Sequence, residues 1–477
     1  MISNLKFCLT FLFLVSCSFV NAQVKIPSYS VEVGSALSAG SETPFWLISN
    51  QYGLLTPNKF NTWLKAGVKT NLSSAKSIDY DYGFEVVNRY SHQNSPYINQ
   101  GYARLKLWFV NIQAGSMEEK FGNQDSSLSS GGLLWSSNAR PMPKVAICIP
   151  NYTPIPYTKG YLEFKGGISH GWFGDQPFAK NYYLHHKFVY LQFGGSLPIH
   201  VHYGFHHYAQ WGGESSGFGK QPQSLKDFIK IFLAKGGGSN ASEGDIINRL
   251  GNHIGSRNFG LDLNLKKYKT GIYWQTIFED GSGKAYRNIS DGLWGIYLHS
   301  NDKHKLITGI VYEFIKTTNQ SGPYNLNPTN PSDTREYGGN DNYFNHWVYQ
   351  AGWTYDNMTI GTPLITSPAL SHGDQYDYLT NNKIIAHHVG LEGDYRKLHY
   401  TLFYTFSLNY GVNSYYLNQG LYPEMHGKSQ HSFMLQTNVS NTLPWGLDLN
   451  VTLGIDKGKM YGNNAGVMVS LVKTGML

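Results

Sequence analysis

Apolar and polar residues alternate strictly in parts of this chain, and residues 447–455 are the clearest case. In Leu-Asp-Leu-Asn-Val-Thr-Leu-Gly-Ile, every odd position holds a branched aliphatic residue and every even position a polar residue or glycine. A β-strand directs successive side chains to opposite faces, so this segment has one apolar and one polar face. Its length matches the ~9–11 residues that a tilted strand needs to cross a bilayer. The pattern predicts a strand of an outer-membrane β-barrel.

The same alternation recurs along the chain. Apart from residues 1–22, the chain would form roughly 16–18 antiparallel strands with their loops. A tight hairpin is predicted at 266–269, whereas 319–345 is a long segment rich in Gly, Pro, Asn and Tyr. Short turns at one end and long loops at the other are typical of outer-membrane barrels, with the long loops outside. The alternating segments are 64–69, 80–87, 104–110, 200–206, 261–266, 399–410 and 465–472.

Composition supports a membrane barrel over a soluble domain. Charged residues make up 14% of the chain and aromatic residues 15%, yet mean hydropathy is −0.34. Soluble domains carry roughly 25% charged residues. An apolar lipid face, a polar lumen and aromatic girdles would together give this balance.

The first 22 residues have the regions of an export signal. Lys6 supplies positive charge, Phe7–Val20 is apolar, and Val20-Asn21-Ala22 offers a small-residue cleavage site. The apolar run is shorter than the ~20 residues of a membrane anchor. We therefore expect a signal peptide over 1–22 and a barrel over 23–477. Leu14-Val15-Ser16-Cys17 also resembles a lipobox, so acylation of Cys17 is the alternative.

Cysteine usage and charge restrict the partners. After cleavage only Cys148 would remain, so no internal disulfide is predicted. The formal net charge is +7, which suits an anionic polysaccharide or lipopolysaccharide. The positive charges form no runs, which argues against nucleic acid. No P-loop, H-E-x-x-H or paired-cysteine motif is present, so no cofactor is predicted.

Residues 222–250 break the alternation. Apolar residues at 225, 228, 229, 232 and 233 have helical spacing and are followed by three glycines. Ser242 to Asp245 resembles a capping box before a second helix. We expect a small helical insertion that either caps or plugs one barrel end or packs on a neighbouring loop.

Residues 130–172 are the most unusual region. Five prolines there argue against a central strand, at positions 141, 143, 150, 154 and 156. Aromatic faces stack on sugar rings, while Arg and Lys pair with carboxylates. The region is therefore either a glycan-binding loop or a constriction loop folded into the lumen. The side chains that favour the first interpretation are Trp135, Arg140, Lys144, Tyr152 and Tyr157.

This region also resembles the capsule assembly Wzi family. The resemblance lies in Asn-Ala-Arg-Pro-Met-Pro-Lys at 138–144, the run 149–157, Gly-Tyr-Leu-Glu-Phe-Lys-Gly-Gly at 160–167, and His170-Gly-Trp172-Phe. It implies an outer-membrane barrel of about 18 strands in a Gram-negative bacterium. It also implies a lectin-like, non-enzymatic role in holding capsular polysaccharide at the cell. His170 and Trp172 join the candidate ligand-binding residues on this basis.

Two smaller patterns have functional alternatives. His200, His202 and His206 share a strand face, which either forms part of a metal site or presents hydrogen-bonded histidines to the lumen. Gly213-Glu-Ser215-Ser-Gly fits the G-x-S-x-G pattern of a serine hydrolase, but a helix does not follow directly as that elbow requires.

The leading hypothesis is a polysaccharide-binding barrel that assists capsule or exopolysaccharide assembly. The alternatives are a porin-like channel and a membrane-embedded hydrolase.

Overall fold

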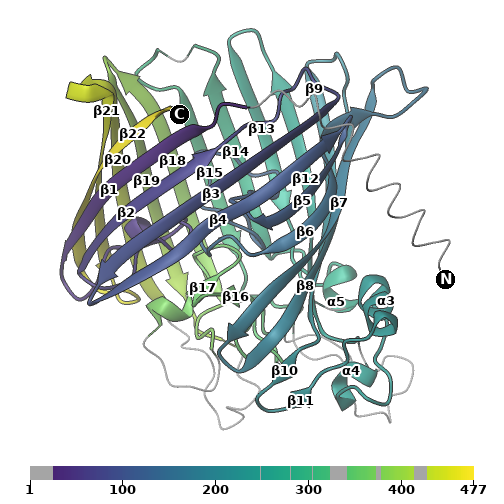
Figure 1. Cartoon of the computed structure of the whole chain (residues 1–477). Helices are drawn as coiled ribbons and strands as arrows, with labels where there is room; N and C mark the ends of the chain where they lie inside the picture. The colour runs from purple at the N-terminus through teal and green to yellow at the C-terminus, as the bar shows by residue number, and fades with distance from the viewer. Residues whose placement is uncertain are drawn as a thin grey trace.

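A computed structural model describes residues 25–477, apart from 248, 280, 303, 323–340, 372–377 and 413–426. The predicted signal peptide, Cys17 and much of the long segment at 319–345 lie outside the described residues. Figure 1 shows a barrel of tilted strands whose interior is partly filled by loops.

The barrel is closed and antiparallel. Its sheet contains twenty strands, of which β10 and β11 are two-residue strands beside β8, and the other eighteen pair in chain order. The first strand, β1, closes the ring by pairing with the last, β22, from Ser28 opposite Met476 to Ala39 opposite Ala465. The predicted fold class and strand number are therefore confirmed.

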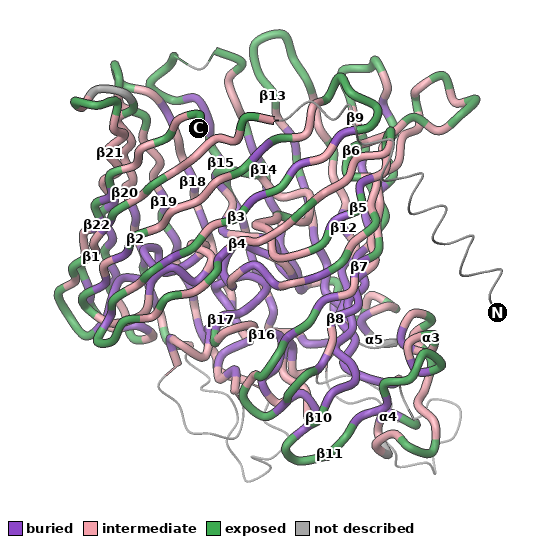
Figure 2. Tube along the Cα trace, in the orientation of Figure 1, coloured by how far each residue is buried: buried purple, intermediate pink, exposed green. Residues whose placement is uncertain are grey.

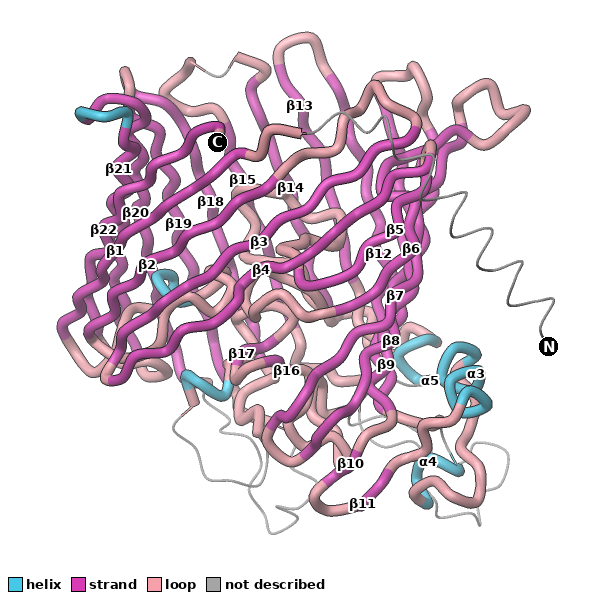
Figure 3. The backbone as a smooth tube through the Cα atoms, viewed as in Figure 1, coloured by secondary structure: helices cyan, strands magenta, loops and turns pink. Residues whose placement is uncertain are grey.

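The eighteen strands of the ring span most of the described residues (Figure 3). They are β1 (Ser28–Ala39), β2 (Phe60–Lys69), β3 (Ile78–Ser91), β4 (Gln93–Leu107), β5 (Val110–Ser116), β6 (Lys144–Pro154), β7 (Leu162–Gln176), β8 (Ala179–Phe193), β9 (Ile199–Trp211), β12 (Asn252–Asn264), β13 (Tyr268–Gln275), β14 (Gly292–Ser300), β15 (Gly309–Lys316), β18 (Ile384–Tyr395), β19 (Leu398–Asn409), β20 (Lys428–Leu443), β21 (Leu447–Gly458) and β22 (Asn464–Met476).

The connections hold the remaining elements. The short strands are β10 (Glu214–Ser215), β11 (Gly219–Lys220), β16 (Thr354–Tyr355) and β17 (Met358–Thr359). The helices are α2 (Phe45–Ile48), α3 (Leu225–Leu233), α4 (Glu243–Ile247) and α5 (Gly281–Lys284), with single 3₁₀ turns at η1 (Pro368–Leu370) and η2 (Pro444–Gly446). Within the described part of the chain, no helix combines the length and apolar character that a membrane span requires.

Side chains of the alternating strands point outward or inward as the sequence predicts. In β21, Leu453 and Ile455 are 44% and 51% exposed on the outer surface, whereas Thr452 and Asp456 point inward and are 1% and 3% exposed. The outer wall therefore presents aliphatic side chains, as a lipid-facing surface does. One predicted strand differs, because a turn at Trp108, with φ of +55°, divides residues 104–110 between β4 and β5.

The two ends of the barrel differ in connection length. At one end, here named the loop end, long connections include 117–143, 212–251 and 317–383. At the other, named the terminus end, strands are joined by turns such as 265–267 and 396–397, and β1 begins and β22 ends there. The hairpin predicted at 266–269 is thus confirmed. This is the outer-membrane layout, with the loop end outside.

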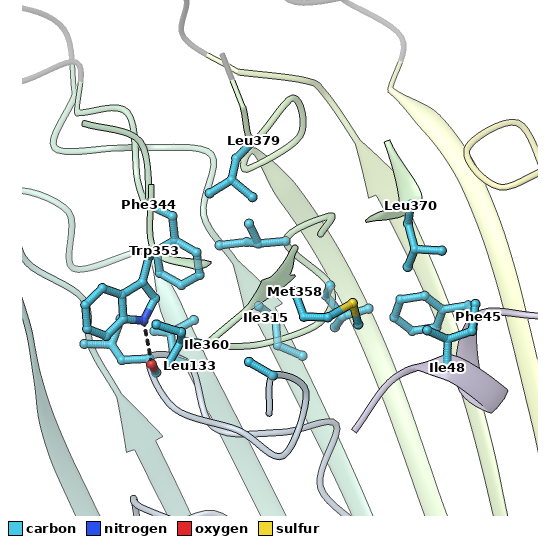
Figure 4. Packing of buried hydrophobic residues seen from close by; sticks show 14 of the residues in the cluster. Phe45, Ile48, Leu133, Ile315, Phe344, Trp353, Met358, Ile360, Leu370 and Leu379 are labelled. Carbon is cyan, nitrogen blue, oxygen red and sulfur yellow. Dashed lines mark hydrogen bonds between the residues drawn. The ribbon is translucent and has the colours of Figure 1, made fainter. Parts of the chain in front are cut away.

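Loops folded into the barrel form a hydrophobic plug toward the loop end. Figure 4 shows Trp353, Phe344, Leu133 and Phe45 packed among strand residues of the inner wall, and all four are 2% exposed or less. The indole Nε1 of Trp353 donates a hydrogen bond to the carbonyl of Leu134 at 2.8 Å. Buried residues accordingly gather in the lower half of the barrel in Figure 2.

A buried carboxylate attaches the plug to the wall. Glu313 of β15 is fully buried and accepts hydrogen bonds from Ser129 Oγ at 2.6 Å, from the Ser130 backbone N–H at 2.8 Å and from the Tyr273 hydroxyl at 2.6 Å. Multiple donors of this kind stabilise a buried carboxylate that would otherwise be costly to desolvate. The plug is therefore held by specific polar contacts as well as by apolar packing.

The expectation that prolines exclude a strand from 130–172 is wrong for β6, which contains Pro150 and ends at Pro154. The register of β6 with β7 shifts between Ile149 and Thr153, so Pro150 lies in a bulge. A bulge leaves residues unpaired, and proline lacks only the N–H that pairing would need.

The helical insertion lies outside the barrel, beside β8 and β9 (Figure 1). A capping box begins α3, in which Ser224 and Asp227 exchange side-chain and backbone hydrogen bonds. Fully buried Ile231 packs against Ala209 and Trp211 of β9 and against Leu250. The insertion therefore contacts the outer wall, and other loops form the plug.

Candidate functional site

A cavity of about 300 Å³ lies in the lumen between the wall β4–β8 and the plug segment that follows β5. Several of its residues, such as Arg104 and Asn111, lie near the terminus end of their strands. Aromatic and charged side chains dominate its lining, namely Arg104, Glu118, Glu119, Lys120, Phe121, Lys144, Lys165, His186, Phe188 and Tyr190.

Lys144 and Trp135 meet at the edge of this cavity. Lys144 opens β6, has a side chain that is 3% exposed, and forms an ion pair with Glu119. Its Nζ lies 5.0 Å from the ring centre of Phe121 and 5.4 Å from that of Trp135. The charge of Lys144 is therefore already compensated within the protein.

Trp135 anchors the plug to the wall. Its ring stacks near Tyr208 of β9 at 5.8 Å and near His186 of β8 at 6.3 Å, with interplanar angles of 12° and 13°. Both partners are buried, and His186 and Tyr208 stack on each other at 4.0 Å. This packing gives Trp135 a structural role that the sequence did not reveal.

Lys165 of β7 is a further cation of the site, outside the set predicted from the sequence. Its Nζ lies 4.8 Å from the ring centre of Tyr152 and 4.6 Å from that of Tyr190. Among the described residues, Lys165 forms no ion pair. Its position in an alternating segment with Phe164 and Ile168 on the opposite face would have placed it in the lumen.

The two tyrosines are held by hydrogen bonds. The Tyr152 hydroxyl pairs with Nδ1 of His202 at 3.1 Å, and Nε2 of His202 lies 3.0 Å from Asp262. The Tyr190 hydroxyl pairs with Nε2 of His206 at 2.7 Å. The rings beside Lys165 are thus fixed in place before any ligand arrives, which lowers the entropy cost of binding.

Glu118 adds a titratable group to the cavity. Burial, followed by the charge of nearby Glu85, raises the pKa of the Glu118 carboxyl. The Asn99 amide donates a hydrogen bond to it at 3.0 Å. A carboxyl that retains its proton more readily can donate a hydrogen bond to a sugar hydroxyl.

Arg140 lies on the other side of the plug segment. Its Nε is 2.8 Å from Asp356, and its guanidinium lies 3.6 Å above the ring centre of Tyr97. Like Lys144, Arg140 has an acidic partner inside the protein. A ligand carboxylate would have to compete with Asp356 for it.

The other three predicted site residues lie elsewhere. Tyr157 is fully exposed in the turn between β6 and β7 at the terminus end. His170 and Trp172 lie on the outer face of β7, where the His170 ring contacts Trp172, Tyr183, Trp211 and Phe228. The structure therefore brings together Trp135, Lys144 and Tyr152 from the predicted set, and adds Lys165 and Tyr190.

The histidines and Ser215 have structural partners. His202 and His206 lie on the inner face of β9 and bond to Tyr152 and Tyr190, and His200 bonds to the Gly195 carbonyl at 3.0 Å. Over the part of the chain that the structure describes, no group of three or more His, Cys, Asp or Glu side chains could hold a metal ion. Ser215 is buried in β10, and its hydroxyl donates to the Val348 carbonyl at 2.8 Å.

Comparison with known proteins adds the family. The sequence model that defines the capsule assembly protein Wzi family matches residues 34–365 of this chain. This chain belongs to that family. No match was found among curated proteins.

A solved structure shares the fold. The Escherichia coli outer membrane protein Wzi, described as a carbohydrate-binding β-barrel involved in group 1 capsule assembly, is 15% identical, with a TM-score of 0.58 over 93% of this chain and 84% of that one. Pseudomonas aeruginosa OpdL is 9% identical, with a TM-score of 0.47 over 95% and 99%. The Wzi family member described here is an outer-membrane β-barrel.

Proposed function

We propose that this barrel binds an anionic surface polysaccharide and assists the assembly or attachment of capsule or exopolysaccharide. Membership of the Wzi family supports this role, since the Escherichia coli Wzi is described as carbohydrate-binding and involved in capsule assembly. The observation that carries the proposal is Lys165, which lines the lumen cavity and whose Nζ lies near the rings of both Tyr152 and Tyr190.

The chemistry of the cavity matches an acidic sugar. The partly exposed ring of Tyr152 provides an apolar face on which a sugar ring can stack, whereas Tyr190 is 2% exposed and positions Lys165. Lys165 can pair with a uronic or similar carboxylate, because it has no acidic partner among the described residues. The formal net charge of +7 adds long-range attraction for an acidic polymer.

Replacing Lys165 separates charge from stacking. Lys165→Met should weaken retention of purified native polysaccharide tenfold or more, because a charge-assisted contact contributes roughly 1.5–3 kcal/mol, and should flatten the salt dependence of binding. Tyr152→Leu should weaken retention while leaving the salt slope nearly unchanged. Retention by the detergent-solubilised protein would be measured across a salt series.

A matched control removes the same charge elsewhere. Lys69 lies at the terminus end of β2 on the inner face and does not line the cavity, so Lys69→Met changes net lumen charge equally and acts on the cavity only through the field at Glu118. It should bind like the wild type. Arg140→Ala should have a smaller effect than Lys165→Met, because Asp356 already neutralises that arginine. Equal binding by wild type, Lys165→Met and Tyr152→Leu would refute this site.

We also propose binding rather than catalysis or solute conduction. The Ser215 hydroxyl bonds to a backbone carbonyl in a strand, so it lacks the exposed strand-to-helix elbow of a hydrolase. The plug fills the lumen toward the loop end with apolar side chains, which opposes an open channel. In cells, deletion of the protein should release capsule or exopolysaccharide into the medium.

A further inference from the structure

An apolar groove of about 880 Å³ runs along the outer wall of the barrel across β5 to β8. The small side chains of Ala114 and Gly166 leave room along it, and larger ones such as Ile147, Val189 and Phe205 flank them. Phe228 of α3 also lines it, so the helix borders the groove. The groove therefore lies where the lipid-facing wall meets the helical insertion.

The apolar surface of α3 is wider than the barrel covers. At roughly 100° per residue, its six apolar residues occupy an arc of about 200°, and only Ile231 of these is fully buried. Leu225, Ile229 and Leu233 continue that arc outward and are 77%, 52% and 51% exposed. The lysines of the helix, Lys226 and Lys230, lie on the remaining side, which is the pattern of a helix at a membrane interface.

A further lysine lies on the lipid-facing wall beneath the helix. Lys187 of β8 lines the groove, donates a hydrogen bond to the Phe232 carbonyl at the end of α3, and lies 4.3 Å from the Phe232 ring centre. Among the described residues it forms no ion pair. A charged side chain at this depth is costly unless an opposite charge accompanies it.

Aromatic side chains lie on the same wall nearer the loop end than Lys187, since Trp172 and Trp211 both pair with Tyr183 of β8. The His170 ring lies 5.2 Å from Trp172 and 5.7 Å from Trp211, both on the outer face near the loop end. Aromatic residues gather where barrel walls cross the membrane–water interface. The groove thus begins at this aromatic level, beside His170 and Phe228, and passes Lys187, whose amino group reaches the end of α3, toward the bilayer interior.

We propose that this groove and α3 form a binding site for lipopolysaccharide, the phosphorylated lipid of the outer leaflet. An acyl chain would occupy the groove over Ala114 and Gly166, and a lipid A phosphate would pair with Lys187. The exposed arc of α3 would enter the same leaflet. A lipid fits better than a second protein, because the arc is continuous with the lipid-facing wall and lysines flank it.

The test is retention of lipid A by the detergent-solubilised full-length protein, measured by native mass spectrometry. Lys187→Met should lower the apparent affinity about tenfold and abolish any preference for phosphorylated over dephosphorylated lipid A. Ala114→Leu should fill the groove and lower affinity for both lipids, while leaving the phosphate preference intact. Heat-modifiability on gels would confirm that each variant forms a barrel.

Two matched variants serve as controls. Lys457 and Ala465 also lie on the outer face near the loop end, on β21 and β22, away from α3. Lys457→Met and Ala465→Leu should bind lipid A like the wild type. Unchanged retention by both test variants would overturn the proposal. So would a dimer that Ile229→Asp disrupts without any loss of lipid A, since it would assign the arc to self-association.

Discussion

The two halves of the lumen are lined by the same alternating strands, yet one half is filled by the apolar plug and the other is polar. Toward the loop end, inward-facing positions meet the plug, and a side chain at Gly454 would lie within 3.0 Å of Pro44 and Leu47. Toward the terminus end, inward-facing Asn450 bonds to Asn438 at 2.6 Å and to Ser470 at 3.2 Å. Alternation thus decides which side chains point inward, whereas docked loops decide whether they meet a dry core or a polar lumen.

The largest expected effect is at the centre of the plug. Trp353→Ala should cost roughly 3–5 kcal/mol of plug packing, because it leaves a large cavity, and it also removes the donor to the Leu134 carbonyl. The barrel wall should survive, so heat-modifiability should persist while conductance in planar bilayers rises. A variant as closed as the wild type would show that the plug is not the barrier.

Three arginine substitutions on β21 test directly whether the plugged half and the polar half of the lumen differ. Val451→Arg faces lipid and should cost roughly 2–4 kcal/mol near the midplane. Thr452→Arg should be comparably harmful, because Thr452 is buried on the plugged side. Asn450→Arg, in the polar half, should be mildest. The measurement is the yield of heat-modifiable barrel, and equal damage at all three positions would contradict that difference.

Acid should loosen the plug through Asp125. Burial raises the pKa of this carboxyl, but hydrogen bonds from His299 and from the backbone of Leu128 and Ser127 outweigh it and hold the pKa below its usual value. The folded-state pKa is thus below the unfolded one, so this stabilisation is present above about pH 4 and is lost as pH falls further. Conductance should therefore rise below about pH 4.

Asp125→Asn should abolish the rise in conductance below about pH 4. It should also weaken the plug by roughly 1–2 kcal/mol at neutral pH. The control is Asp302→Asn, because Asp302 is exposed in a connection at the terminus end. It should behave like the wild type at every pH. An unchanged acid response in Asp125→Asn would mean that another carboxyl holds the plug.

The smallest effect is expected at Tyr157. Its side chain is fully exposed in a turn outside both halves of the lumen, so Tyr157→Ala should alter stability by no more than about 0.5 kcal/mol. Polysaccharide retention should also be unchanged. Loss of retention would extend the ligand surface to the terminus end and break the assignment of binding to the cavity.

The sequence predicted the strands and their faces because alternation is a local property. It could not show that Glu119 and Asp356 compensate Lys144 and Arg140, since both partners approach through folded loops. Nor could it show that a bulge lets Pro150 remain within β6. Lys165 was within reach as an inward-facing lysine, but its placement near two tyrosines needed the pairing of β6, β7 and β8.

The seam between β1 and β22 has a consequence for biogenesis. Residues such as Ser28 and Met476 are partners across nearly the whole chain, so cylinder closure demands a contact of very high sequence separation. Such contacts form slowly, because a long loop must close before they contribute. Until β22 arrives, the unpaired edge of β1 can recruit other strands. Closure is therefore the step at which an assembly factor that shields the β1 edge would most accelerate maturation.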